Sequence, residues 1–176
     1  MDMQRKISNV MCALVVSGGV GAVVVSAPVF AEKTPEQIKR LQLTAGLGDS
    51  QSQLALAEAY ALGYGGLIAS EEKAVEWLTQ AALQGNTMAQ YNLGDMYYFG
   101  FGVEKSATAA YEWYLAATAK RHPHAHYMLA LLQAQGEMGP SDESLVRYWL
   151  KEGASYGDPS ASYVLNQMGI DKLNRL

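Results

Sequence analysis

Apolar and small side chains recur at helical spacing along most of this chain, and the same pattern returns every 36 or 37 residues. In the middle copy, Ala89, Leu93, Met96 and Tyr97 lie three or four positions apart, or directly side by side, and lead to Gly100. This spacing places the four side chains on one face of a helix. Related stretches start at positions 52 and 125. The chain is therefore predicted to contain three copies of this helix.

Each copy also contains a second predicted helix, built around a tryptophan. Trp77, Trp113 and Trp149 follow one another at intervals of 36 residues. Each tryptophan stands among alanines and other apolar residues at helical spacing, so we expect it on the buried face. The repeating unit is thus a pair of helices. Side chains that favour helix starts precede the second helices, namely Ser70, Ser106 and either Ser141 or Asp142.

One position of the first helix is small in all three copies. It is occupied by Ala57, Gly94 and Ala130. A glycine inside a helix costs about 1 kcal/mol relative to alanine. Gly94 therefore predicts a crossing at which even a Cβ atom would hold two helices apart.

Units of this size cannot bury their apolar faces alone, and stacked neighbours complete the core. A helix with a capping box is expected before the first unit, where Thr34 precedes Pro35 and Gln37. We predict an all-α fold, an α/α solenoid with a capping helix at each end. The expected segments are an N-terminal capping helix in 32–51, helix-turn-helix repeats in 52–88, 89–124 and 125–160, and a C-terminal capping helix and tail in 161–176.

The middle unit carries a specific set of small and aromatic residues, namely Ala89, Leu93, Gly94, Met96, Tyr97, Gly100, Gly102, Val103, Ala110, Trp113, Tyr114 and Ala117. This set resembles the pattern of the Sel-1-like repeat family, and the outer two units match it more loosely. The resemblance implies a TPR-like α/α solenoid of the exported bacterial type. Because members of the family are described mainly as adaptors or scaffolds, it also implies a protein-binding role.

The chain departs from the family pattern in two respects. Arg121 stands where the other units have Gly85 and Gly157, so we expect the second helix of the middle unit to end differently. Some exported relatives carry a disulfide in each repeat, whereas this chain has a single cysteine.

Residues 1–31 have the pattern of a secretory signal peptide. Arg5 and Lys6 precede an apolar run over 10–25, and a small-residue cleavage site ends at Ala31. We expect cleavage there, a periplasmic or secreted protein, and no membrane attachment afterwards. The alternative is an uncleaved anchor, but the apolar run is shorter than the roughly 20 residues that a span requires and is interrupted by a serine and two glycines.

The net charge and the number of cysteines argue against several classes of protein. The net charge is −4 and no dense basic stripe is present, which argues against a nucleic-acid binder. The cysteine, Cys12, lies in the predicted leader, so the mature protein would have no thiol nucleophile, thiolate metal site or disulfide. We predict no cofactor, and we interpret the chain as non-enzymatic.

Two patterns suggest an enzyme as the alternative. Ser70 and Lys73 match the S-x-x-K motif of serine β-lactamases and penicillin-binding proteins, which would make an envelope enzyme of β-lactamase-like or peptidoglycan-related type. The companion motifs S-D-N and K-T-G are absent, and a serine helix cap explains the residues. Glu58 and Asp95 occupy the same position in consecutive units and could form an acid/base pair for sugar chemistry.

The histidines suggest a metal-binding alternative. His122, His124 and His126 are the only three in the chain, and imidazoles are common ligands of zinc and copper. Side chains two positions apart on a helix point in different directions. We therefore favour a polar turn between repeats, in which Pro123 begins the next helix.

The leading hypothesis is a protein-binding surface on the first helices, which usually line the concave side of such solenoids. Tyr98 and Phe99 stand beside polar positions, as in many contact surfaces. The alternative is that both aromatics pack locally against Tyr64 or Phe101. The family resemblance makes envelope or host proteins the first partners to consider. The predicted partner-binding residues are Glu58, Leu62, Asn92, Asp95, Tyr98, Phe99, Met128 and Leu131.

Overall fold

The computed structural model describes residues 33–173, with the side chains of residues 33–169. The predicted leader lies outside these residues. Within the described range all regular structure is helical, and none of these helices is both long and apolar enough to cross a membrane. The elements are α2 (Pro35–Gly46), α3 (Ser50–Leu62), the short 3-10 helix η1 (Tyr64–Gly66), α4 (Glu71–Leu83), α5 (Thr87–Phe99), α6 (Ala107–Thr118), α7 (Pro123–Ala134), α8 (Glu143–Ser155) and α9 (Pro159–Leu173).

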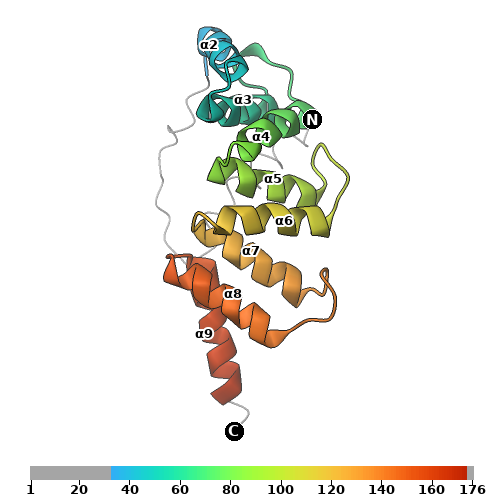
Figure 1. Cartoon of the computed structure of the whole chain (residues 1–176), viewed down its shortest axis with the longest axis vertical. Coiled ribbons are helices and arrows are strands. Elements are labelled where there is room, and N and C mark those ends of the chain that lie inside the picture. The colour runs from blue at the N-terminus through green and yellow to red at the C-terminus, as the bar shows by residue number, and fades with distance from the viewer. Residues whose placement is uncertain (1–32, 174–176) are drawn as a thin grey trace, which may run out of the picture.

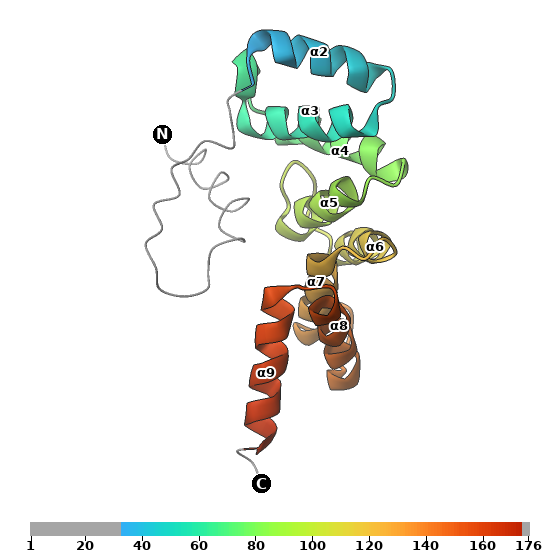
Figure 2. The same ribbon diagram turned by 90° about the vertical axis from the view of Figure 1, so that its left-hand side faces the viewer.

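The helices stack in chain order into one column, from α2 at one end to α9 at the other (Figure 1). Each helix packs chiefly against the helices next to it in the chain. The last helix, α9, points along the column, whereas α2 and α3 lie across it (Figure 2). The predicted all-α solenoid with flanking helices is confirmed.

The helix starts follow the predicted capping chemistry. Thr34 and Gln37 form a capping box at α2, with the Thr34 N–H donating to Gln37 Oε1 at 2.7 Å. The hydroxyl oxygens of Ser70 and Ser106 accept backbone N–H bonds at the starts of α4 and α6. At α8 the cap is Asp142, which accepts from two backbone N–H groups. These bonds satisfy donors that a helix start otherwise leaves unpaired.

A second series of caps starts the first helix of each unit and was not predicted as a series. In each case the side chain of the residue just before the helix accepts the N–H of the residue three positions on. This bond fixes the point at which the chain enters each new unit. The capping residues are Asp49, Asn86, His122 and Asp158.

The second helix of the middle unit ends at Thr118, one residue before the position equivalent to Leu83 and Ser155, but Arg121 adopts the same backbone conformation as the glycines of the other units. Arg121 has φ 61°, in the same left-handed region as Gly85 at 80° and Gly157 at 91°. The reason is a shared hydrogen bond, from the N–H of the next cap to the carbonyl five residues earlier. In the middle unit this bond joins His122 N to Ala117 O at 3.2 Å. Closing it forces the preceding residue into the left-handed region, whatever its side chain.

The close crossing predicted at Gly94 is present. A Cβ atom at Gly94 would lie 2.5 Å from Cε1 and 2.6 Å from Cδ1 of Tyr114. Tyr114 lies on α6 and is fully buried. The ring of Tyr114 therefore occupies the space that the missing side chain leaves.

The predicted burial of the tryptophans is wrong in degree. Trp77, Trp113 and Trp149 are partly buried and pack at the edges of the core clusters. The most buried position beside each tryptophan is the residue that follows it on the same apolar face, whereas the indole lies at the margin of that face. These residues are Leu78, Tyr114 and Leu150, which are 4%, 0% and 1% exposed.

Candidate functional site

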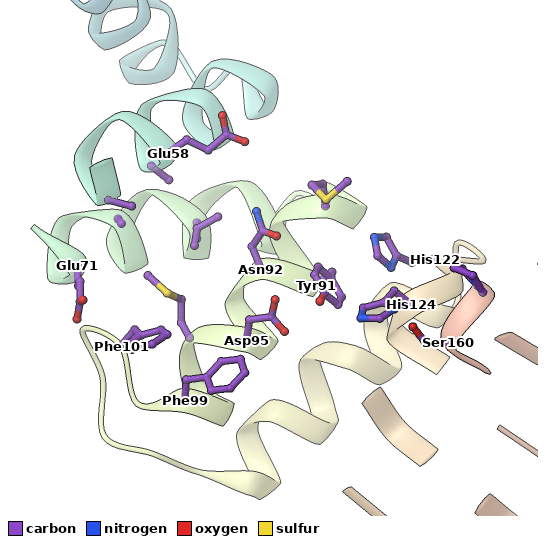
Figure 3. Close-up of a pocket in the computed structure, with 17 residues that line it drawn as sticks. Glu58, Glu71, Tyr91, Asn92, Asp95, Phe99, Phe101, His122, His124 and Ser160 are labelled. Carbon is purple, nitrogen blue, oxygen red and sulfur yellow. The ribbon is translucent and has the colours of Figure 1, made fainter. Parts of the chain in front are cut away.

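A cavity of about 460 Å³ opens along the first helices of the units. Its lining comes from α3, α4 and α5, the loop after α5, and the beginnings of α7 and α9. Figure 3 shows polar side chains of α5 at its centre and aromatic rings on either side. Several units thus build one hollow. Its lining includes Glu58, Glu71, Leu78, Met88, Tyr91, Asn92, Asp95, Phe99, Phe101, His122, His124 and Ser160.

Asp95 is held in the cavity wall by a phenol from the second helix of its own unit. The hydroxyl of Tyr114 donates to Asp95 Oδ1 at 2.7 Å. Burial raises the pKa of Asp95 to about 6, although hydrogen bonding from Tyr114 and Tyr91 acts in the opposite direction. The carboxylate is therefore poised to respond to any charge that enters the cavity.

His122 combines a structural bond with a place in the cavity lining. Its Nδ1 accepts the N–H of Ala125 at 3.3 Å, and its ring stacks on Tyr91 with centroids 4.5 Å apart. Burial, followed by the proximity of His124 and His126, lowers the pKa of His122 to about 4. The ring is therefore neutral near pH 7, as its acceptor role at Nδ1 requires.

His124 is tied to the start of α9. Its Nδ1 lies 2.7 Å from Oδ2 of Asp158, a residue that is 3% exposed. Burial raises the pKa of Asp158, but hydrogen bonds from His124 and the Ala161 N–H outweigh burial and hold this pKa below its usual value. The pair links α7 to α9 across one end of the cavity.

The three histidines therefore serve separate purposes. His126 is 4% exposed, and its Nδ1 lies 2.8 Å from the carbonyl of His122. Among the residues that the structure describes, no group of three or more His, Cys, Asp or Glu side chains is arranged to hold a metal ion. The proximity of the histidines in sequence does not become a shared ligand set.

Asp95 and His122 make opposite contributions to stability as the pH changes. The pKa of Asp95 rises from 3.8 to about 6 in the fold, so its stabilising contribution is full below pH 3.8 and is lost as the pH rises through 6. The pKa of His122 falls from 6.5 to about 4, so its contribution is full above pH 6.5 and is lost as the pH falls through 4. Between about pH 4 and 6.5 the two effects offset each other.

Ser70 and Lys73 do not form the pair that the S-x-x-K motif requires. The Ser70 hydroxyl accepts the backbone N–H of Lys73 at 3.2 Å and donates to Glu72 Oε2 at 2.9 Å. The Lys73 ammonium lies over the ring of Tyr60, 5.2 Å from its centroid. The hydroxyl proton is thus directed to a carboxylate in a helix cap, and the lysine amine is held elsewhere.

The two candidate carboxylates both line the cavity, in different surroundings. Glu58 lies 3.7 Å from the ammonium of Lys33, and its side chain is 41% exposed. Asp95 is also half-buried and is bound by a phenol. Figure 3 places the two on different helices, with Glu58 on α3 and Asp95 on α5.

The structure brings together half of the predicted partner-binding residues. Glu58, Asn92, Asp95 and Phe99 line the cavity. Met128 is 2% exposed and belongs to the core, so its prediction as a contact residue is wrong. Met128 packs in the core with residues of α6, so it does not reach the concave surface expected for the first helices. Half-buried positions outside the lining are occupied by Leu62, Tyr98 and Leu131.

The adjacent residues Tyr98 and Phe99 have different surroundings. Tyr98 is half-buried and donates from its hydroxyl to Gln135 Oε1 at 3.0 Å, which joins two units. Phe99 is 40% exposed, stacks on Phe101 with centroids 5.6 Å apart, and faces the cavity. The predicted local packing against Phe101 is thus present for Phe99, alongside its exposure.

Sequence reasoning missed four important participants, Tyr91, Tyr114, His122 as a cap, and Asp158. His122 and Asp158 could have been found from the series of capping residues, which recur at intervals of 36 or 37 residues. Tyr91 and Tyr114 leave no comparable signal, because their roles depend on the angle at which α5 crosses α6.

Comparison with known proteins identifies the family to which these repeats belong. The sequence profile of the Sel1 repeat matches residues 50–86, 87–122 and 123–158, which is more than half of the chain. The chain belongs to the Sel1 repeat family. Sel1 repeat proteins are generally protein-interaction scaffolds and typically lack enzymatic activity.

Solved structures of Sel1 repeat proteins share the fold. A Sel1 repeat protein from Oxalobacter formigenes superposes with a TM-score of 0.67 at 32% identity, and the match covers 75% of this chain and 98% of that one. A protective antigen of uropathogenic Escherichia coli gives a TM-score of 0.72 at 23% identity over 76% of this chain and 28% of its own. The second likeness shows the fold alone.

The Sel1 repeats also match a curated fungal protein, chitin synthase regulatory factor 3 of Schizosaccharomyces pombe. It is 28% identical over 140 residues, which cover 78% of this chain and 15% of that protein. The chain thus spans less than a fifth of that relative's length.

Proposed function

We propose that this Sel1 repeat protein is a non-enzymatic scaffold that holds a segment of a partner protein in the cavity along its first helices. The observation that carries the proposal is the cavity itself, which is lined by side chains from several units and from α9. Its volume of about 460 Å³ falls within the range of binding pockets, roughly 300–1,000 Å³. The regulatory role named for the fungal relative is consistent with an adaptor.

The cavity is suited to binding because its polar groups are held before a partner arrives. Asp95 is bound by Tyr114, His122 is stacked on Tyr91, and His124 is bound to Asp158. Side chains fixed in this way lose little conformational entropy on association. Binding energy would then come from the contacts themselves and would not be spent on ordering the site.

The proposal is tested by placing a photo-crosslinking phenylalanine analogue at Phe99, which is exposed and faces the cavity. The matched control carries the same analogue at Leu115, which is 42% exposed on α6 and lies outside the cavity lining. In native cells we expect a discrete protein adduct at position 99 that is missing at position 115. Equal adducts at both positions, or none at position 99, would contradict the proposal.

We also propose that the scaffold works in the periplasm or outside the cell. The support is the leader-like pattern over residues 1–31 and the absence of cysteine after it. The intact mass of the protein recovered from native cells tests this. A chain beginning at Glu32 would agree with the proposal, whereas an intact leader in the membrane fraction would favour an anchored protein.

A further inference from the structure

The cavity contains three acidic side chains, and among the described residues Asp95 is the one that makes neither an ion pair nor a hydrogen bond to a backbone N–H. Its lining contains Glu58, Glu71 and Asp95 but no lysine or arginine. Glu58 lies beside the ammonium of Lys33, and Glu71 accepts the N–H of Gly102 at 3.0 Å. Among the described residues, the hydrogen bond to Asp95 comes from the neutral phenol of Tyr114. A half-buried carboxylate without an ion-pair partner is stabilised by a cation that approaches it.

The second observation is a cavity-facing amide that has no hydrogen-bond partner in the described part of the chain. Asn92 is 9% exposed and lines the cavity, and its side chain makes no hydrogen bond to any residue in the described part of the chain. It lies three positions before Asp95 on α5, so the two side chains share a helix face. Figure 3 shows the Asn92 amide and the Asp95 carboxylate facing the same space. The amide atoms of Asn92 are not among the fully buried unpaired atoms of the described residues, so they are open to the cavity and available to a ligand group.

The walls around these two groups suit a cation with an apolar stem. Phe99 and Phe101 stack on each other at one side, and Tyr91 lies on the other side. Aromatic faces attract ammonium and guanidinium groups. Leu78 and Met88 add apolar surface for methylene groups.

We infer that the cavity accepts a basic side chain of the bound partner, with arginine preferred over lysine. The inference rests on the proposed scaffold function and names the chemistry of its partner. A guanidinium group can donate to Asp95 and to the side-chain oxygen of Asn92 at the same time, whereas an ammonium group is a single point charge. The stem of the side chain lies along Phe99.

The test uses a defined probe, a capped glycine-arginine-glycine peptide, titrated into the isotopically labelled full chain and followed by NMR. The control peptide carries citrulline, which has the shape of arginine without its charge. We expect millimolar binding of the arginine peptide, movement of the Asn92 side-chain amide signal, and at least tenfold weaker binding of citrulline. Equal affinity for both peptides would overturn the inference.

Matched variants locate the site. Asp95→Asn should weaken the arginine peptide at least tenfold, whereas Glu112→Gln, the same loss of charge at an exposed position of α6, should leave affinity within twofold. Because Asp95→Asn could disturb the fold, Asn92→Ala provides a second variant, for which we expect a threefold to tenfold loss. Unchanged affinity in a folded Asn92→Ala variant, or an equal loss in Glu112→Gln, would count against the inference.

The experiments distinguish a failure of the arginine inference from a failure of the proposed scaffold function. If the arginine peptide does not bind while the analogue at Phe99 still captures a partner, the scaffold stands and the basic side chain is wrong. If the peptide binds at Asp95 while no partner is captured, the preference for arginine stands and the scaffold role falls.

Discussion

The close crossing of α5 and α6 predicts that Gly94→Ala destabilises the protein, although alanine is the better helix former. The new Cβ would lie 2.5 Å from Cε1 and 2.6 Å from Cδ1 of Tyr114. That ring is fully buried and its hydroxyl is bound to Asp95, so it cannot move away without breaking the bond.

The expected magnitude follows from three contributions. Helix propensity favours alanine by about 1 kcal/mol. Overpacking of a close-fitting core costs about 1–3 kcal/mol, and a weakened hydrogen bond to a charged group costs about 1.5–3 kcal/mol. The steric and hydrogen-bond costs outweigh the propensity gain, so we expect the free energy of unfolding to fall by about 1.5–5 kcal/mol.

Urea unfolding followed by circular dichroism measures this loss, and Gly46→Ala is the matched control. Gly46 is also helical, but a Cβ there meets no atom within 4 Å, so we expect no loss and a gain of up to about 1 kcal/mol. Combining Gly94→Ala with Tyr114→Leu should cost no more than Tyr114→Leu alone, because the clash is removed. A Gly94→Ala variant as stable as the wild type would refute the reasoning.

Three further predictions concern other residues. Arg121→Gly should raise the free energy of unfolding by about 1 kcal/mol, because φ at this position is 61°; a loss in the same urea assay would show that the side chain outweighs the strain. The free energy of unfolding of Asp95→Asn, relative to that of the wild type, should rise by up to about 3 kcal/mol between pH 4 and pH 6.5. The reason is that the wild type loses a stabilising contribution as the pH passes the Asp95 pKa of about 6. Parallel curves of stability against pH for the two proteins would contradict this. Tyr98→Ala should cost about 1–2 kcal/mol, because its ring is half-buried and its hydroxyl is bonded to the next unit, whereas Phe99→Ala should cost less than about 1 kcal/mol. Equal losses for Tyr98→Ala and Phe99→Ala by thermal unfolding would not agree with their different burial.

The fold could be predicted because its information is local and repeated. The capping box at Thr34 and the cap at Ser70 lie within three residues of the groups they bind. The tight crossing at Gly94 could be predicted because an unfavourable residue in a helix needs a packing reason. Each of these signals can be recognised within a short stretch of the sequence.

The cavity could be predicted only in part, because its geometry depends on how the units are rotated. The equivalent positions of Glu58 and Asp95 in consecutive units predict that the two lie on one surface, and both line the cavity. The rotation of the helices that buries Met128 is set by side chains from neighbouring helices, which no single window contains. The link between His124 and Asp158 joins residues from consecutive units and depends on that same rotation.

Packing between consecutive helices also determines how the protein can open. Since α9 is held mainly by α8 and α7, fraying of this terminal helix need not disturb α3 to α6. Fraying begins at the free end of α9, whereas Ser160 and Asp158 lie at its start beside the buried Ala161. Only undocking of the whole helix would remove Ser160 from the cavity wall and release Asp158 from His124. One end of the cavity could thus open and close while Asn92 and Asp95 remain fixed, which gives a long partner segment a way in from the side without threading through a closed rim.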